Sequence, residues 1–70
     1  MLNEMNITVN GEGRCFPCGT TLFGLVEALK LEPERVAIEL NRAIVRRESW
    51  GGTEIGEGAE IEIVMFVGGG

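Results

Sequence analysis

A single amphipathic stripe is the feature that most constrains how this chain can fold. Four apolar residues recur at the i, i+3, i+4, i+7 spacing that places them on one face of a helix: Leu22, Leu25, Val26 and Leu29. Thr21 before the stripe predicts the helix N-cap, and the helix is expected to end near Lys30. Gly24 within it predicts close packing on a sheet. One helix cannot cover both faces of a sheet, so the sheet is expected to be half exposed.

The remaining segments have the patterns of short strands and turns. Residues 5–9 alternate apolar and polar side chains, and Asn10-Gly11 is a favoured hairpin turn. The other predicted strands are 14–16, kept short by Gly13 and Pro17, then 36–40 and 44–46. Residues 41–43 predict a tight connection, and residues 47–50 predict a helical turn.

The last predicted strand, residues 60–67, changes character along its length. It begins with alternating glutamate and isoleucine and then becomes apolar on both faces, which indicates a strand in the middle of the sheet. The first and last strands can lie parallel at the centre, with the helix across one face. The expected fold is therefore α+β, a β-grasp or ubiquitin-like roll, with a mixed sheet of four to five strands packed on one main helix. Residues 1–67 form this domain, and residues 68–70 form a flexible glycine tail.

Composition excludes several classes of function. The chain has 70 residues, enough for one domain, and a net charge of −5 without a basic patch, so a nucleic-acid partner is not expected. It contains no histidine, which removes Ser-His-Asp and Cys-His catalysis and histidine metal ligands. We therefore expect neither a metal site nor a stand-alone enzyme. There is no apolar run long enough to span a membrane and no signal-peptide pattern at the N-terminus, so the expected location is the cytoplasm.

Cys15 and Cys18 precede the predicted helix and allow three interpretations. At this spacing they could form a redox pair, since a helix N-terminus lowers a thiol pKa. A zinc site needs four ligands as a rule and would require two copies of the chain. The favoured interpretation is that both are small strand and turn residues without a catalytic role, kept reduced in the cytosol.

Residues 40–50 also allow two interpretations. The segment is either a hairpin with an arginine face and a tryptophan over the core edge, or a docking surface. Arginine and aromatic residues are enriched where interfaces are strongest, so Arg46 and Arg47 are candidate docking residues.

The final glycines, Gly68, Gly69 and Gly70, follow an apolar run directly. Without side chains, such a tail is thin enough to enter another protein's active site and present its carboxylate there. The alternative is a frayed end or a cloning remnant.

Three parts of the chain together resemble the ThiS family, the sulfur carriers of thiamine biosynthesis. The first is the opening strand with Asn10-Gly11 and Thr21. The second runs from Leu40-Asn41 through Ile44-Val45 to residues 47–50, and the third from residues 62–64 to Gly69-Gly70. The chain departs from the family pattern at Arg46, where proline is frequent, at Gly58-Ala59, where Gly-Asp is frequent, and at Gly68, where alanine is frequent. The two cysteines are not part of the pattern.

The resemblance implies a mechanism and a set of partners. An adenylyltransferase of the ubiquitin-activating type would use ATP to adenylylate the carboxylate of Gly70. A persulfide from a sulfur donor, such as a cysteine desulfurase, would then displace AMP and leave a thiocarboxylate. Thiazole synthase would take this sulfur. The carrier itself would catalyse nothing and bind no cofactor. Gly68 and Gly69 would give access to the active site, and Leu40, Val64 and Phe66 would lie at the docking surface.

Other functions remain open at this point. The main alternative carrier is the small subunit of molybdopterin synthase, although residues 65–67 lack the Pro-Pro-like stretch usual before that family's Gly-Gly. The remaining alternatives are a β-grasp binding module that is not a carrier, and a small redox protein that uses Cys15 and Cys18.

Overall fold

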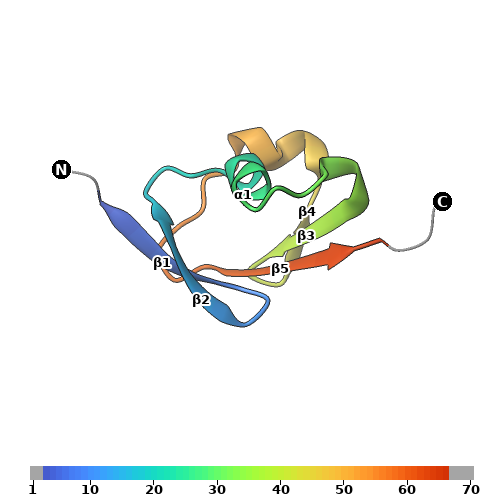
Figure 1. Ribbon diagram of the computed structural model, residues 1–70. Coiled ribbons are helices and arrows are strands. Elements are labelled where there is room, and N and C mark those ends of the chain that lie inside the picture. Colours follow the sequence, from blue (N-terminus) through green and yellow to red (C-terminus); the bar gives the residue numbers. More distant parts are fainter. Residues whose placement is uncertain (1–2, 67–70) are drawn as a thin grey trace.

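The computed structural model describes residues 3–66, which form a five-stranded mixed sheet with one α-helix across one face (Figure 1). The elements in chain order are β1 (Glu4–Val9), β2 (Glu12–Pro17), α1 (Leu22–Ala28), the 3₁₀ turn η1 (Pro33–Arg35), β3 (Val36–Leu40), β4 (Ala43–Val45), the 3₁₀ segment η2 (Arg47–Gly52) and β5 (Glu60–Met65). The strand order across the sheet is β2-β1-β5-β3-β4. This is the predicted β-grasp arrangement, with the far face of the sheet open.

The first and last strands lie side by side at the centre of the sheet, as predicted. β1 pairs with β5 in parallel, with Thr8 opposite Glu60 and Val9 opposite Ile61. On its other side β5 pairs antiparallel with β3, from Val36–Met65 to Leu40–Ile61. β5 ends at Met65, and the predicted end at Val67 lies outside the described residues.

Helix α1 begins where the sequence predicts and ends earlier. The Thr21 hydroxyl accepts a hydrogen bond from the Gly24 backbone N–H at 3.0 Å, which caps the first turn. The helix ends at Ala28 because Lys30 adopts a left-handed backbone with φ of 60°. The prediction that Gly24 packs closely on the sheet is wrong, since a Cβ there would meet only Thr20 and Thr21 at ordinary contact distances.

β2 is twice as long as the predicted segment 14–16, because Gly13 and Pro17 lie inside it. β2 is an edge strand, and an edge strand tolerates a proline that cannot donate to a neighbour. The turn between β3 and β4 is as tight as predicted, with positive φ at Asn41 and Arg42. β4 begins one residue earlier than expected, and η1 was not predicted.

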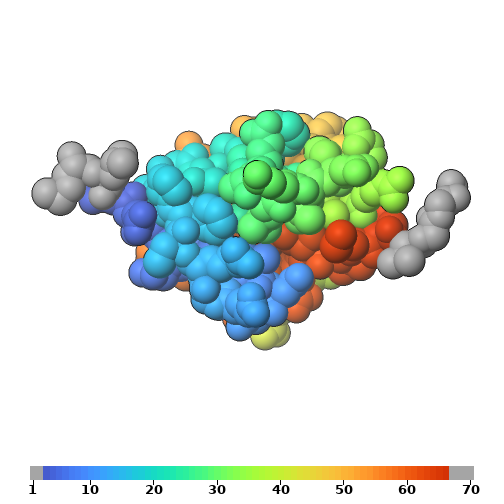
Figure 2. Space-filling view, in the orientation of Figure 1, coloured from blue at the N-terminus to red at the C-terminus, as the bar shows by residue number. Residues whose placement is uncertain are grey.

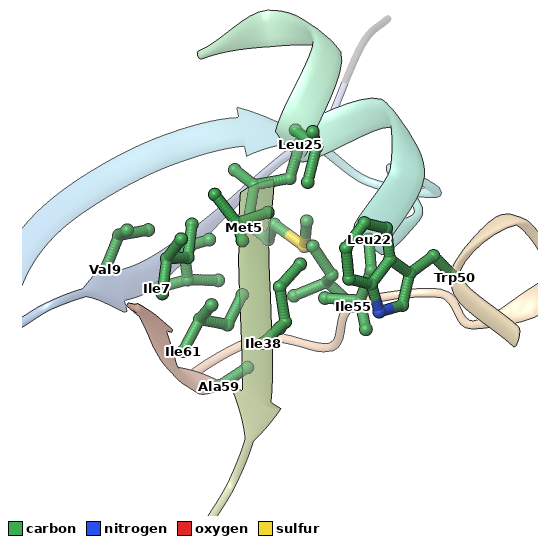
Figure 3. Packing of buried hydrophobic residues seen from close by; sticks show 13 residues of the cluster. Met5, Ile7, Val9, Leu22, Leu25, Ile38, Trp50, Ile55, Ala59 and Ile61 are labelled. Atoms are coloured by element: carbon green, nitrogen blue, oxygen red, sulfur yellow. The ribbon is translucent and has the colours of Figure 1, made fainter. Parts of the chain in front are cut away.

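The core lies between α1 and the inner face of the sheet, with η2 closing one end (Figure 3). Strands β1, β3 and β5 contribute every second residue to it, including Met5, Ile7, Ile38 and Ile61. Trp50 of η2 is 1% exposed and lies beside Leu22 and Ile55 in Figure 3. Its indole Nε1 donates to the Val45 carbonyl oxygen at 2.9 Å, so this buried aromatic residue leaves no polar atom unpaired. Among residues 3–66 no helix is long and apolar enough to cross a membrane.

Two asparagines at hairpin tips hold β5 from both sides. The Asn10 side chain accepts from the Ile63 N–H at 2.8 Å and donates to the Ile63 carbonyl oxygen at 3.3 Å. Asn41 Oδ1 accepts from the Glu60 N–H at 2.9 Å, and the Asn41 backbone N–H donates to the Glu60 carbonyl oxygen at 2.7 Å. Both asparagines have φ of 52°, a left-handed conformation that asparagine tolerates better than most residues. The strand that leads to the glycine tail is therefore fixed on both flanks.

Replacing Asn10 by glycine should isolate the value of its side-chain clamp, since glycine retains the left-handed backbone at no steric cost. We expect the free energy of unfolding to fall by about 1–2 kcal/mol, because the Ile63 N–H and carbonyl oxygen lose their partners. Urea denaturation followed by circular dichroism measures this change. Asn41→Gly is the matched control and should cost less, because its side chain makes a single exposed bond. Equal stability of Asn10→Gly and the parent chain would show that the clamp contributes nothing.

Candidate functional site

The described part of the chain ends at Phe66, directly after β5 and beside η1. The Phe66 N–H donates to the Arg35 carbonyl oxygen at 2.8 Å, so the last described residue is still tied to the β3 side of the sheet. Val64, Met65 and Phe66 are 54%, 60% and 56% exposed. The predicted reactive residue, Gly70, and the predicted access residues, Gly68 and Gly69, lie outside the described residues, so their roles stay predictions.

Two of the predicted docking residues lie on the open face of the sheet, away from α1. Val64 stands opposite Ala37 of β3, and Phe66 falls on the same face by the alternation of the strand. Ile44 of β4, opposite Glu39, is also on this face and is 73% exposed. We call Ile44, Val64 and Phe66 the open-face patch. The sequence analysis included Ile44 only within the possible docking segment 40–50 and did not name it among the docking residues, because the face it lies on depends on the strand register.

Leu40 does not join this patch. It is partly buried, packs against the core and stands opposite the buried residue Ile61. Leu40 and Val64 therefore point to opposite faces of the sheet, because they fall on opposite phases of the strand alternation. The structure thus does not bring Leu40 together with Val64 and Phe66.

The two predicted docking arginines differ in their surroundings. The Arg46 side chain is 82% exposed, and its Nε lies 3.8 Å from Glu48 Oε2, a weak surface pair. Arg47 instead joins η2 to η1, since its Nε donates to the Pro33 carbonyl oxygen at 3.0 Å. Its guanidinium carbon lies 5.9 Å from the centroid of the Trp50 ring. Arg46 is thus available to a partner, whereas Arg47 supports the fold.

An acidic hollow of about 550 Å³ lies on the open face beside the patch. Its lining includes Glu39, Glu60 and Glu62, with Arg42 at 3.8 Å from Glu60 as the single basic residue. Glu39 stands directly opposite Glu62 in the sheet, and like charges in that position repel. The open face therefore combines exposed apolar side chains with uncompensated negative charge, which suits a partner surface that carries basic residues.

Cys15 and Cys18 are both exposed and unpaired with each other. Cys15 lies in β2, where its Sγ donates to Asn6 Oδ1 at 3.0 Å, and the Cys18 N–H donates to the Asn3 carbonyl oxygen at 2.9 Å. The chain between them is extended, so their Cα atoms are about 10 Å apart at 3.3 Å per residue. A disulfide requires less than about 7 Å, so the two thiols cannot pair within this fold. This geometry argues against the redox interpretation.

Comparison with known proteins covers nearly the whole chain. A model of the ThiS family matches residues 6–70. The crystal structure of the thiamine biosynthesis protein ThiS from Geobacter metallireducens superimposes with a TM-score of 0.82 at 35% identity, over 94% of this chain and 100% of that one. The solution structure of a thiamine biosynthesis protein from the same organism gives 0.77 at 35% identity, over 94% of this chain and 88% of that one.

Three curated sequences extend the comparison. A thiazole synthase from Magnetococcus marinus is 46% identical over 66 residues, which are 94% of this chain and 20% of the synthase. A thiazole synthase from Paramagnetospirillum magneticum is 36% identical over the same shares. The chain thus spans about a fifth of the length of these relatives. The uncharacterized protein ycf40 of Porphyra purpurea is 33% identical over the full length of both chains.

The family match and the structural neighbours agree with the resemblance indicated by the opening strand with Asn10-Gly11 and Thr21, by residues 40–50 and by residues 62–70. The match at residues 6–70 covers β1 from its third residue onward, the other four strands, the capped helix and the final glycines. The chain therefore belongs to the ThiS family.

Proposed function

We propose that this chain is a sulfur carrier that delivers sulfur to the thiazole ring of thiamine in the cytoplasm. The observation that carries the proposal is the family match to residue 70, which includes the glycine tail as well as the folded domain. The chain acts as a protein co-substrate and not as an enzyme. The proposal puts the reactive group at the C-terminal carboxylate, and among residues 3–66 no polar or charged side chain is buried.

The reactive group in this proposal is the carboxylate of Gly70. An oxygen of this carboxylate attacks the α-phosphorus of ATP in an adenylyltransferase of the ubiquitin-activating type, and pyrophosphate leaves. The terminal sulfur of a persulfide, supplied by a cysteine desulfurase or a similar donor, then attacks the acyl carbon and AMP leaves. A thiol reductant cleaves the resulting acyl disulfide and releases the thiocarboxylate. ATP belongs to the enzyme, and the carrier holds no cofactor.

The tail sets how far the carboxylate reaches. Four residues follow Phe66, and fully extended they span at most about 14 Å. Gly68 and Gly69 contribute no side chains, so the last part of this span can enter a narrow channel. The enzyme must therefore approach the end of β5 closely.

The open-face patch and the acidic hollow are proposed to dock these enzymes. Ile44, Val64 and Phe66 supply exposed apolar surface, and Glu39 and Glu62 supply negative charge beside it. Arg46, the residue after β4, has an 82% exposed side chain that the same partners could contact. Thiazole synthase is proposed as the acceptor because two relatives with that name contain a segment similar to this chain.

Intact-mass spectrometry tests the carrier function. The chain is incubated with ATP, the cognate adenylyltransferase, a cysteine desulfurase with cysteine, and a thiol. Replacement of one oxygen by sulfur should raise the mass by about 16 Da, and fragmentation should locate the change at Gly70. A chain that stays unmodified, while the same enzymes load a known carrier, would refute the proposal.

Glu62→Lys should separate docking from stability. The substitution replaces a repulsive pair with Glu39 by an attractive one, so the free energy of unfolding should rise by about 0.2–1 kcal/mol. The KM of the adenylyltransferase for the carrier should rise on the order of tenfold, because the charge that attracts a basic surface is reversed. Glu27→Lys on the exposed side of α1 is the matched control and should leave KM unchanged. An unchanged KM for Glu62→Lys would remove the acidic hollow from the docking surface.

The double variant Cys15→Ser, Cys18→Ser tests the redox interpretation. We expect sulfur loading within about twofold of the parent chain and stability within about 0.5 kcal/mol, as is usual for exposed positions. Loading is followed by mass and unfolding by urea titration. Loss of loading with an intact fold would restore a functional role for the thiols.

A further inference from the structure

Among the described residues, the edge of β5 that faces β1 has no neighbouring strand beyond Asn10. Because β1 turns away at Asn10-Gly11, its pairing with β5 stops at Val9–Ile61, and the Asn10 side chain then takes both backbone groups of Ile63. The backbone groups of Glu60 and Phe66 point the other way, toward the β3 side. By this alternation the N–H and carbonyl oxygen of Met65 point to the same side as those of Ile63. Within residues 3–66 neither group has a hydrogen-bond partner.

An apolar groove of about 270 Å³ lies directly beside this open edge. Its walls come from three separate parts of the chain: Val9 of β1, Leu29 and Leu31 after α1, and Ile63 and Met65 of β5. The polar residues Asn10, Glu12 and Arg14 of the β1–β2 hairpin also line it, and Arg14 Nη2 lies 3.9 Å from Glu12 Oε1. In Figure 2 the red surface of β5 emerges on this side between the blue β1–β2 hairpin and the green segment that follows α1. The groove is on the α1 side of the sheet and is thus separate from the open-face patch.

The length of the remaining chain determines what can reach this edge. An enzyme that acts on Gly70 must bring its active-site entrance within about 14 Å of Phe66, the full reach of four residues. A segment of the enzyme near that entrance can therefore lie against the end of β5. An extended segment there can use both the unpaired backbone groups of Met65 and the apolar groove. Added strands gain main-chain hydrogen bonds from an exposed edge, and pockets for alternate side chains give them specificity.

We propose that a short extended segment of the adenylyltransferase adds to β5 at Met65, on the side opposite β3. Its backbone pairs with the N–H and carbonyl oxygen of Met65, and one of its apolar side chains fills the groove between Leu31 and Met65. The inference rests on the proposed carrier function and adds to it a second contact surface, on the other face of the sheet from Val64. Together the two surfaces clamp β5 and fix the direction in which the tail leaves it.

Amide hydrogen exchange tests the backbone pairing. In the free carrier the Met65 amide should exchange rapidly, whereas the Phe66 amide, bonded to Arg35, should be slower. In the complex with the adenylyltransferase and ATP, exchange at Met65 should slow at least about tenfold. A Met65 amide that exchanges equally fast in the complex would overturn the inference. Protection of Met65 already in the free carrier would also overturn it, because the chain itself or a second copy would then occupy the edge.

Met65→Gln tests the groove. Glutamine preserves the length of this exposed side chain and removes its apolar character, so folding should be unaffected. We expect the KM of the adenylyltransferase to rise on the order of tenfold with an unchanged kcat, as expected when apolar contact area is lost on binding. Phe23→Gln, an exposed apolar residue on α1, is the matched control and should change KM by less than about twofold. Equal KM values for Met65→Gln and Phe23→Gln would overturn the groove contact.

The two proposals fail in different ways. If the parent chain gains its 16 Da but Met65 shows neither protection nor a KM effect, the carrier function stands and the strand addition is wrong. If the parent chain is not loaded while a known carrier is, both are wrong.

Discussion

Deleting Gly69 and Gly70 should abolish thiocarboxylate formation and leave the stability of the domain unchanged. The proposed reaction needs a carboxylate that reaches the α-phosphate of ATP, and removal of two residues shortens the reach from Phe66 by about 7 Å. A displacement far smaller than this already costs orders of magnitude in rate, so no loading should be detectable. The free energy of unfolding should not change, because a glycine has no side chain to bury. Intact mass after the loading reaction and urea denaturation measure the two effects.

Gly69→Val provides a finer version of the same experiment. A branched side chain beside the reacting residue should block a narrow channel, so loading should fall on the order of a hundredfold at full chain length. Gly51→Val in η2 is the matched control, since a Cβ at Gly51 meets no atom within 4 Å. Equal loading by both valine variants would show that the tail does not enter a narrow channel.

Trp50→Ala should remove a large share of the stability of the domain. The indole is 1% exposed, packs with Leu22 and Ile55 and donates to the Val45 carbonyl oxygen. Truncation of a buried tryptophan costs about 3–5 kcal/mol. A domain of this size is stabilised by about 4–10 kcal/mol, so the substitution removes a large share of the total. Thermal unfolding by circular dichroism measures the loss.

Two further variants identify the source of this effect. Trp50→Phe removes the hydrogen bond and part of the volume, so it should cost distinctly less than the alanine variant. Phe23→Ala removes an aromatic ring that is 39% exposed and should cost about 1 kcal/mol or less. A Trp50→Ala variant as stable as Phe23→Ala would show that η2 does not close the core.

The sequence predicted the order of elements because each strand and the helix carry their own periodicity. Met5–Val9 alternates, the stripe from Leu22 to Leu29 has helical spacing, and a single helix leaves one face of the sheet open. The central position of β5 was also predicted, but the argument assumed that its apolar end is buried on both faces. Its apolar end is not buried on both faces, since Val64 and Met65 are more than half exposed. The apolar run therefore indicated surface available to a partner as well as a central strand.

The boundaries of elements depended on information that local patterns lack. Pro17 interrupts a strand pattern, yet it lies within β2 because β2 has a neighbour on one side only. The stripe residue Leu29 packs on the core although the helix has already ended at Ala28. In both cases the position in the sheet or the core decides the outcome, and that position is known only after the whole chain is folded.

The sequence analysis could not tell which face of the sheet each residue of the segment 40–50 lies on. Leu40 belongs to the core side, whereas Ile44, four residues later, lies on the open face. The face of a residue on a short strand depends on register, and a shift of one residue reverses it. The roles of Arg46 and Arg47 separate for a similar reason, because only the fold brings Pro33 within reach of Arg47.

The pairing of β1 with β5 also has a consequence during synthesis. Thr8 meets Glu60, so the middle of the sheet joins segments from opposite ends of the chain. Such non-local pairing forms late, and a growing chain that lacks β5 has a gap between β1 and β3 with unpaired strand edges on both sides. The domain can therefore complete its sheet only once residue 65 has left the ribosome. We therefore expect a nascent or truncated chain without β5 to stay unfolded and sensitive to proteases, because Ile61 and Ile63 are then missing from the core.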